Sequence, residues 1–400
     1  MNKALIFIPG IKGTKLYDAN TINNEVLWED VRFNFDDISR TELTFQHNER
    51  FYEEDYNTIV KPLQIEPLAY REFWKKLNPV YKNKFIFPYD WRLPNKENGR
   101  RLKLFMDELV EKSKASDRVA TITHFDFVTH SMGNMPLRYY IQAHGMDRID
   151  KIVFTVPPFL GAADAISAMA VGQGFFFKRD EIRKLARSLP ALFELLPTYS
   201  HYAIDASDGS PIDLWNKDNW QKNLVTQGND PEKNRSIEKF IVNLNTAKSE
   251  LENLSKWMDH ITEEQKAKMM VLVKTDVKTL TDIVIEKHPA DGNPDNYFDF
   301  QKSLQYNEGG DGVVPCASSC HYFEDIPTYD FRNRPWLDDF KHPFFLKDNR
   351  VQRIINSYLS TSQNASGYEN KVFGRSVHRV TALKNHQVSE DGITHIVTEI

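Results

Sequence analysis

The sequence predicts an α/β fold in which a mostly parallel sheet is covered by helices on both faces. Short apolar segments alternate with amphipathic helical patterns between residues 85 and 156, and this alternation is typical of parallel strands joined by helices. The apolar segment 125–130 runs into Ser131, and a helical pattern follows directly, which predicts a sharp strand-to-helix turn. At 400 residues, 40% of them hydrophobic, the chain is long enough for one large domain with insertions.

Charge and cysteine content exclude several classes of protein. A formal net charge of −5 gives no reason to expect nucleic acid as a partner. Cys316 and Cys320 are the only cysteines, too few for a disulfide framework, so we expect a reducing, cytoplasmic location. No metal-ligand or cofactor motif is present, and we expect neither a metal nor a cofactor. The oligomeric state does not follow from the sequence.

The N-terminal segment predicts a strand rather than a signal peptide. Residues 5–8 are apolar and enter a Pro9-Gly10 turn without a small-residue cleavage site. The stretch 152–177 has a single charged residue, Asp164, and the length of a membrane span. Prolines at 157 and 158 and glycines at 161, 172 and 174 divide it, so we expect a strand, a loop and a short helix there.

Four parts of the chain follow from the element patterns. Residues 1–160 are expected to form the first part of the core, with a surface insertion at about 20–80, where charged and aromatic residues show no clean period. Helical patterns dominate 161–265 and predict a cap or lid. Residues 266–361 are expected to complete the core, and 362–400 to form a C-terminal extension. Within the two core parts, 1–160 and 266–361, we expect strands at 5–8, 85–88, 125–130, 152–156 and 269–273, and helices at about 102–110 and 133–143.

Ser131, Asp311 and His342 follow the chain order nucleophile, acid, histidine that is found in α/β-hydrolase folds. Asp311 lies in a Gly-Asp-Gly turn, which projects a carboxylate, and His342 follows it by 31 residues. A serine hydroxyl needs a histidine to take its proton, and the acid orients that histidine. Other residues that could fill the same roles are the histidines His321, His378, His386 and His395 and the acids Asp276, Asp295 and Asp299.

The elbow at Ser131 departs from the Gly-x-Ser-x-Gly pattern at one position. Thr129 stands where the first glycine is usual, while Gly133 is retained. His124 and His130 flank the elbow, and we expect them to support its shape.

Several segments together resemble the lecithin:cholesterol acyltransferase and lysosomal phospholipase A family of α/β-hydrolases. The matching segments are 8–16, 89–92, 130–135, 157–162, 310–315 and His342. The resemblance implies the roles given above for Ser131, Asp311 and His342, and an oxyanion hole formed by the backbone N–H groups of Ile11 and Met132. It also implies a membrane-contacting region within 25–75 and a lid after Gly161. The residues we expect to contact substrate are Trp28, Phe159, Leu160, Phe175 and Phe176.

The sequence therefore predicts a serine acyl hydrolase of lipid acyl esters. A phospholipase A or lysophospholipase is expected, with water as acceptor or a lipid alcohol in its place, and with transient contact to a membrane surface. A soluble carboxylesterase or thioesterase is an alternative. Another alternative is an inactive hydrolase fold that serves as a binding module. Phe175 and Phe176 lie in a glycine-hinged loop at 172–177 that either touches acyl chains or packs under the cap.

Overall fold

The fold is described from a computed structural model. The residues that it describes are 2–19, 25–28, 60–77, 81–117, 120–172, 179–287, 296–300, 309–332, 341–362, 365, 377–380, 387–388 and 394–395.

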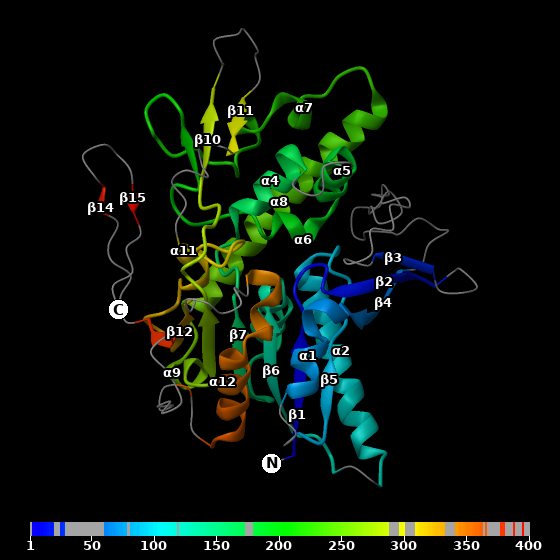
Figure 1. Cartoon of the computed structure of the whole chain (residues 1–400). Coiled ribbons are helices and arrows are strands. Elements are labelled where there is room, and N and C mark those ends of the chain that lie inside the picture. Colours follow the sequence, from blue (N-terminus) through cyan, green and yellow to red (C-terminus); the bar gives the residue numbers. More distant parts are fainter. Residues whose placement is uncertain are drawn as a thin grey trace.

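Seven strands within these residues form the central sheet, in the order β13-β12-β9-β7-β6-β1-β5 (Figure 1). Their bounds are β1 (Lys3–Ile8), β5 (Lys84–Ile86), β6 (His124–His130), β7 (Ile149–Thr155), β9 (Met269–Val273), β12 (Thr328–Phe331) and β13 (Val377–Arg379). Neighbouring strands are parallel except that β13 is antiparallel to β12. This mostly parallel sheet confirms the predicted α/β-hydrolase fold.

Alternate side chains of the strands face opposite sides of the sheet, and helices bury both sides. Ile6, Phe127 and Phe154 belong to one core cluster, which is covered by α2 (Asn95–Lys114) and α3 (Asn134–His144). Phe7 and Val153 belong to the other cluster, which is covered by α1 (Pro67–Lys76) and α12 (Asn349–Ser360). Because both faces are covered, β1 and β9 are almost wholly apolar, as is usual in parallel sheets.

A small antiparallel sheet has two of its three strands in the predicted surface insertion, and its middle strand precedes the insertion. Its strand order is β3-β2-β4, with β2 (Thr14–Asp18), β3 (Glu25–Trp28) and β4 (Val60–Ile65). Figure 1 shows it beside the β5 edge of the main sheet, with α1 leading back from it to the core. The insertion therefore contributes a core helix as well as surface structure.

The cap lies over one end of the main sheet (Figure 1) and contains both helices and strands. Its described helices are α4 (Ala163–Val171), α5 (Arg179–Ser188), α6 (Pro190–Phe193), α7 (Lys222–Val225) and α8 (Pro231–Met258). The next helix, α9 (Glu263–Lys266), lies away from the cap, below β12 in Figure 1. A three-stranded sheet β11-β10-β8 joins β8 (Ala203–Asp205) to β10 (Ile283–Glu286) and β11 (Tyr297–Asp299). This sheet pairs residues from both sides of position 265, where the predicted cap ends.

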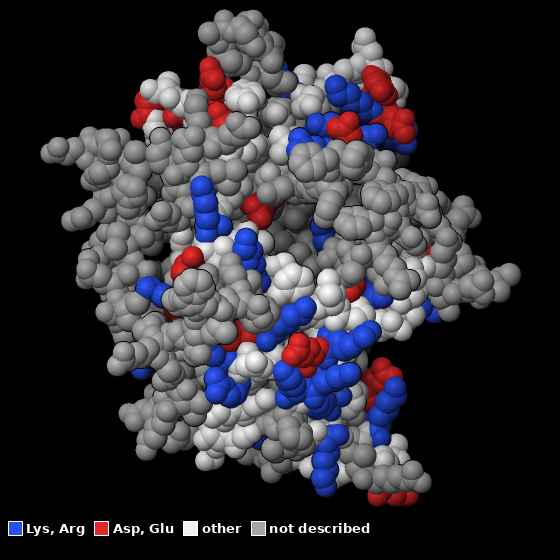
Figure 2. All heavy atoms as spheres, viewed as in Figure 1, with Lys and Arg blue, Asp and Glu red and all other residues white. Residues whose placement is uncertain are grey.

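The remaining short elements follow the cap. They are α11 (Cys316–Ser319), the 3₁₀ helix η4 (His342–Lys347), β14 (Gln387–Val388) and β15 (Thr394–His395). No helix in the described ranges is both long enough and apolar enough to cross a bilayer. Figure 2 shows basic side chains gathered on the lower half of one face, over α1 and α12, with acidic side chains among them.

Candidate active site

Ser131 sits at a sharp turn between strand β6 and helix α3. Its φ is +53°, a left-handed conformation that costs a non-glycine residue on the order of 1–3 kcal/mol and is usually found at functional sites. The Asn134 side chain donates to the Ser131 carbonyl at 2.7 Å and helps to hold the turn. A short 3₁₀ turn, Ser131–Gly133, leads into α3. The predicted strand-to-helix turn is therefore present.

The Pro9-Gly10 turn packs directly against this elbow, and two glycines permit the contact. A Cβ on Gly10 would lie 2.9 Å from the Cβ of Ser131, and a Cβ on Gly133 would lie 2.4 Å from the carbonyl oxygen of Pro9. Both distances are too short for any other residue. Gly133 is thus required by the approach of β1, which explains why the second glycine of the elbow is retained.

Ser131, His342 and Asp311 form one hydrogen-bonded chain. The Nε2 of His342 lies 2.8 Å from the Ser131 Oγ, and its Nδ1 lies 2.6 Å from the Asp311 Oδ2. All three side chains are buried. Since the carboxylate accepts, Nδ1 carries the proton and Nε2 is left to accept the serine hydroxyl. We refer to these three residues as the hydrogen-bonded triad.

The Gly-Asp-Gly turn fixes the Asp311 carboxylate. Its Oδ1 accepts the backbone N–H groups of Val313 at 3.0 Å and Val314 at 2.8 Å. Gly312 has a φ of +96°, and a Cβ on Gly310 would lie 2.3 Å from the Thr279 hydroxyl. Both glycines are therefore needed for the turn, and Asp311 is left with Oδ2 for His342.

Most of the other acids and histidines named from the sequence belong to the described residues and lie away from the triad. Asp276 pairs with Lys274 at 2.8 Å. Asp299 is on β11 in the cap, and His378 is on β13. Asp295 and His386 lie outside the described residues, and His395 is on β15.

Two backbone N–H groups beside Ser131 are available as donors. In the described part of the chain, no acceptor takes the N–H of Ile11 or of Met132. Met132 follows Ser131, and Ile11 follows Gly10, which packs on Ser131. Free N–H groups in this position can stabilise an oxyanion.

The residues at 89–92 support the turn that carries Ile11. The Tyr89 hydroxyl donates to the Pro9 carbonyl, and the Trp91 indole N–H donates to the Thr14 carbonyl, both at 3.0 Å. Both side chains are fully buried. They hold the turn at its two ends, a role that the sequence had not indicated.

The residues predicted to contact substrate occupy different places. Trp28 packs edge-on against Trp91 with 5.2 Å between ring centroids, and the Lys12 amine lies 5.3 Å from the Trp28 ring. Trp28 is therefore close to the turn that carries Ile11. Phe159 is buried between Phe154 and Tyr322. Phe175 and Phe176 lie outside the described residues.

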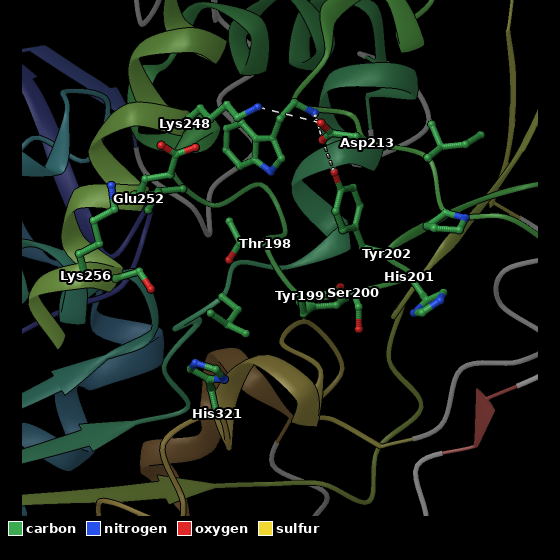
Figure 3. A pocket seen from close by; sticks show the side chains of 16 residues that line it. Thr198, Tyr199, Ser200, His201, Tyr202, Asp213, Lys248, Glu252, Lys256 and His321 are labelled. Atoms are coloured by element: carbon green, nitrogen blue, oxygen red, sulfur yellow. Dashed lines mark hydrogen bonds and ion pairs between the residues drawn. The ribbon is translucent and has the colours of Figure 1, made fainter. Parts of the chain in front are cut away.

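Leu160 lines a cavity of about 770 Å³ between the cap and the core (Figure 3). Figure 3 shows Lys248, Glu252 and Lys256 of α8 on one side of it and His321 at its base. Apolar atoms supply most of its surface, although polar and charged residues are prominent among those that line it. The triad residues are absent from its described lining, so this cavity is a separate hollow.

Two side chains next to the elbow make contacts that the sequence did not reveal. The Tyr70 hydroxyl lies 2.9 Å from His130 Nδ1, within hydrogen-bond distance, and it accepts the Gly10 N–H at 3.1 Å. Burial, reinforced by the neighbouring His342, lowers the pKa of His130 to about 3. His130 was expected to support the elbow. Tyr70 was not identified, because it lies in the segment without a clean period.

Comparisons with known proteins identify a family and a fold. The family model described as lecithin:cholesterol acyltransferase matches residues 70–298. A chain in the crystal structure of the Tle4–Tli4 complex aligns with 89% of this chain and 98% of its own, with a TM-score of 0.62 and 14% identity. This likeness shows the fold. A search of curated proteins finds no match.

Two further solved structures align with lower TM-scores and over smaller parts of their own chains. Lipase BlEst2 of Bacillus licheniformis, in its propeptide form, aligns with 92% of this chain and 52% of its own, with a TM-score of 0.39 and 10% identity. Phospholipase PlaB of Legionella pneumophila aligns with 42% of this chain and 27% of its own, with a TM-score of 0.22 and 16% identity. This chain therefore spans about half of the first protein and about a quarter of the second.

Proposed function

Because this chain belongs to the lecithin:cholesterol acyltransferase family, we propose that it is a serine-dependent hydrolase of lipid acyl esters, with phospholipase A or lysophospholipase activity. The observation that carries the proposal is the unbroken chain from Ser131 Oγ to His342 at 2.8 Å and from His342 to Asp311 at 2.6 Å. The matched range 70–298 includes Ser131 and ends before the other two residues, so the geometry supports their roles independently.

In the first half of the proposed reaction, the Ser131 Oγ attacks the ester carbonyl carbon. A new C–O bond forms while the serine proton passes to Nε2 of His342. The Asp311 carboxylate stabilises the imidazolium through Nδ1–H. Proton transfer of this kind contributes a factor of about 10²–10⁴ in rate.

The carbonyl oxygen becomes an oxyanion in the tetrahedral intermediate. In our proposal it accepts the N–H groups of Ile11 and Met132, which have no acceptor in the described part of the protein. Each donor of this kind is worth about 2.7–4 kcal/mol in the transition state. The packing of Gly10 on Ser131 supports this assignment, because it brings the first donor to the nucleophile.

In the second half, the ester C–O bond breaks and the alcohol leaves with the proton from His342. The acyl group stays on Ser131. Water then attacks the acyl carbon while His342 removes its proton. The bond between the acyl carbon and Ser131 Oγ breaks, the proton passes from His342 to Oγ, and the carboxylic acid is released. A lipid alcohol in place of water would make the reaction an acyl transfer.

Exposed apolar side chains support a transient contact with a lipid surface. Val26 on β3 and Leu63 on β4 are 41% and 51% exposed, and Leu68 at the start of α1 is 48% exposed. All three belong to the region 25–75, which was expected to contact membranes. The low cysteine content of the sequence, Cys316 and Cys320 alone, is the basis for the cytoplasmic location that we propose.

The test compares the wild type with Ser131→Ala on phospholipid vesicles and on p-nitrophenyl esters of graded chain length. We expect Ser131→Ala to lose about 10⁴–10⁶-fold in kcat. Ser188→Ala is the matched control, since it removes a buried cap hydroxyl that bonds to the Leu185 carbonyl, and it should keep wild-type activity. Equal activity of Ser131→Ala and the wild type on every substrate would contradict the proposal.

Substrate preference separates lipid hydrolysis from the alternative of a soluble esterase. A phospholipase should cleave phospholipids in vesicles faster than dissolved short-chain esters at equal concentration. The opposite preference would favour a carboxylesterase or thioesterase with the same serine mechanism.

A further inference from the structure

A chain of three hydrogen bonds joins the Pro9-Gly10 turn to His342 through two buried side chains. The Gly10 N–H donates to the Tyr70 hydroxyl at 3.1 Å, the Tyr70 hydroxyl lies 2.9 Å from His130 Nδ1, and His130 Nε2 lies 3.0 Å from the His342 carbonyl oxygen. Tyr70 and His130 are 3% and 2% exposed. Four segments distant in sequence thus meet in one line, which we call the Tyr70–His130 relay.

The two ends of the relay fix the direction of every hydrogen bond in it. The backbone N–H of Gly10 can only donate, and the backbone carbonyl of His342 can only accept. His130 therefore carries its proton on Nε2, and its bare Nδ1 accepts the Tyr70 hydroxyl proton. The neutral imidazole that this requires agrees with the lowered pKa of the buried ring. Every polar atom of the relay is satisfied in this arrangement.

Packing leaves the relay little freedom. The rings of Tyr70 and His130 meet edge-on with 5.4 Å between centroids. A Cβ on Gly10 would lie 3.1 Å from His130 Nδ1, so the turn rests directly on the imidazole. Helix α1 carries Tyr70, and its N-cap residue Glu66 is tied to the chain just after the turn. The N–H of Glu66 donates to the Gly13 carbonyl at 2.9 Å. The turn and the relay are therefore one packed unit.

We propose that Tyr70 and His130 are positioning residues that keep the Ile11-bearing turn and His342 in register around Ser131. This inference rests on the proposed function, since the relay connects the proposed oxyanion donor to the proposed base. Both side chains act through backbone groups of other residues, the Gly10 N–H and the His342 carbonyl. Their loss should lower kcat and leave KM nearly unchanged, because the transition state depends on this register more than substrate binding does.

Two single variants break different links. Tyr70→Phe keeps the ring and its packing but removes the acceptor of Gly10 and the donor to His130. His130→Asn keeps an oxygen near the position of Nδ1 for the Tyr70 hydroxyl and removes the bond to His342. We expect each to lower kcat on p-nitrophenyl esters by about tenfold to a hundredfold, the scale of a small misplacement of reacting groups. Tyr358→Phe is the matched control, since its buried hydroxyl donates to the Lys268 carbonyl outside the relay, and it should keep the wild-type kcat.

The double variant distinguishes a relay from two independent contacts. In a relay, Tyr70→Phe and His130→Asn interrupt the same line, so the double variant should lose little more than the worse single variant. Rates are expressed per active site counted with a fluorophosphonate, which excludes misfolded protein. A wild-type kcat in Tyr70→Phe, or losses that multiply in the double variant, would overturn the proposal.

A second measurement does not depend on activity. ¹⁵N NMR of labelled histidines, with the His130 signal identified from its absence in His130→Asn, reports which ring nitrogen carries the proton. We expect a neutral ring protonated at Nε2 in the wild type and in Ser131→Ala between pH 5 and 8. A ring protonated at Nδ1, or at both nitrogens, would overturn the relay even in an active enzyme. An inactive wild type with the expected ring would instead contradict the proposed function.

Discussion

Asp311 holds His342 at two points. Its carboxylate Oδ2 lies 2.6 Å from the imidazole Nδ1, and its backbone carbonyl accepts the backbone N–H of His342 at 2.9 Å. The backbone contact does not depend on the acid side chain. Changes to the carboxylate should therefore alter the protonation of the imidazole while His342 stays in place.

Asp311→Asn should lower kcat by about 10⁴-fold, the loss typical of a wrong histidine tautomer. The asparagine oxygen can still accept the N–H groups of Val313 and Val314. Its NH₂ group then faces Nδ1 of His342, which forces the ring proton onto Nε2, where it blocks transfer from Ser131. The measurement is kcat on a p-nitrophenyl ester, with the melting temperature as a check of folding. A loss below tenfold in a folded variant would contradict the assigned roles.

Gly133→Ala should destabilise the protein and displace the Pro9-Gly10 turn from the elbow. Its new Cβ would lie 2.4 Å from the Pro9 oxygen and 2.5 Å from the Ile8 oxygen, and overpacking of this kind costs about 1–3 kcal/mol. Gly228→Ala is the matched control, because nothing lies within 4 Å of the added methyl. Urea unfolding measures the difference. Equal stability of the two variants would show that the turn is not held as tightly as the structure indicates.

In Glu194→Gln, the free energy of unfolding should fall less steeply with rising pH than it does in the wild type. Burial raises the pKa of Glu194 from 4.5 to about 8 in the folded protein. Between these values the unfolded chain has lost the proton and the folded chain keeps it, so the free energy of unfolding falls as pH rises through this window. The glutamine keeps an oxygen for the Asn95 N–H, which Glu194 accepts at 2.9 Å.

The measurement for this variant is urea unfolding at pH 5 and at pH 8. The wild type should lose more stability between the two pH values than Glu194→Gln does, by on the order of a few kcal/mol. Other groups titrate in the same window, such as Asp126, where burial raises the pKa to about 6. Both proteins contain these groups, so their contribution cancels in the comparison. Identical losses in the two proteins would contradict a protonated Glu194.

Five of the seven central strands were predictable because each contains an apolar run, whereas β12 and β13 have none and were not predicted. Residues 269–273 form β9 as expected, and the elbow strand differs from β6 by one residue. Helix α2 begins at Asn95, before its apolar pattern starts at Leu102, because Glu194 of the cap accepts the Asn95 N–H. A partner about a hundred residues away leaves no local pattern.

The two three-stranded sheets were not predictable for a related reason. Strand β2 pairs with β4 across some forty intervening residues, with Thr14 opposite Ile65. Strand β8 pairs with β10, with Ala203 opposite Ile283. These strands are short and only partly apolar, so their pairing depends on tertiary context more than on sequence pattern.

Order and turn chemistry pointed to Ser131, Asp311 and His342, and the structure places them in hydrogen-bond contact. Tyr70 was missed because both of its partners lie 60 positions away, Gly10 on one side and His130 on the other. A tyrosine in an aromatic-rich segment without a clean period has no feature that distinguishes it. Only the folded arrangement shows its contacts.

The acyl-Ser131 intermediate is the central claim and can be observed directly. Wild-type protein is mixed with a p-nitrophenyl ester, quenched in acid within the first turnovers and digested, and the peptide masses are measured. We predict that the peptide containing Ser131 gains the mass of the acyl group and that Ser131→Ala shows no such gain. Full turnover by the wild type with the acyl group on another residue, or unimpaired turnover by Ser131→Ala, would contradict the account.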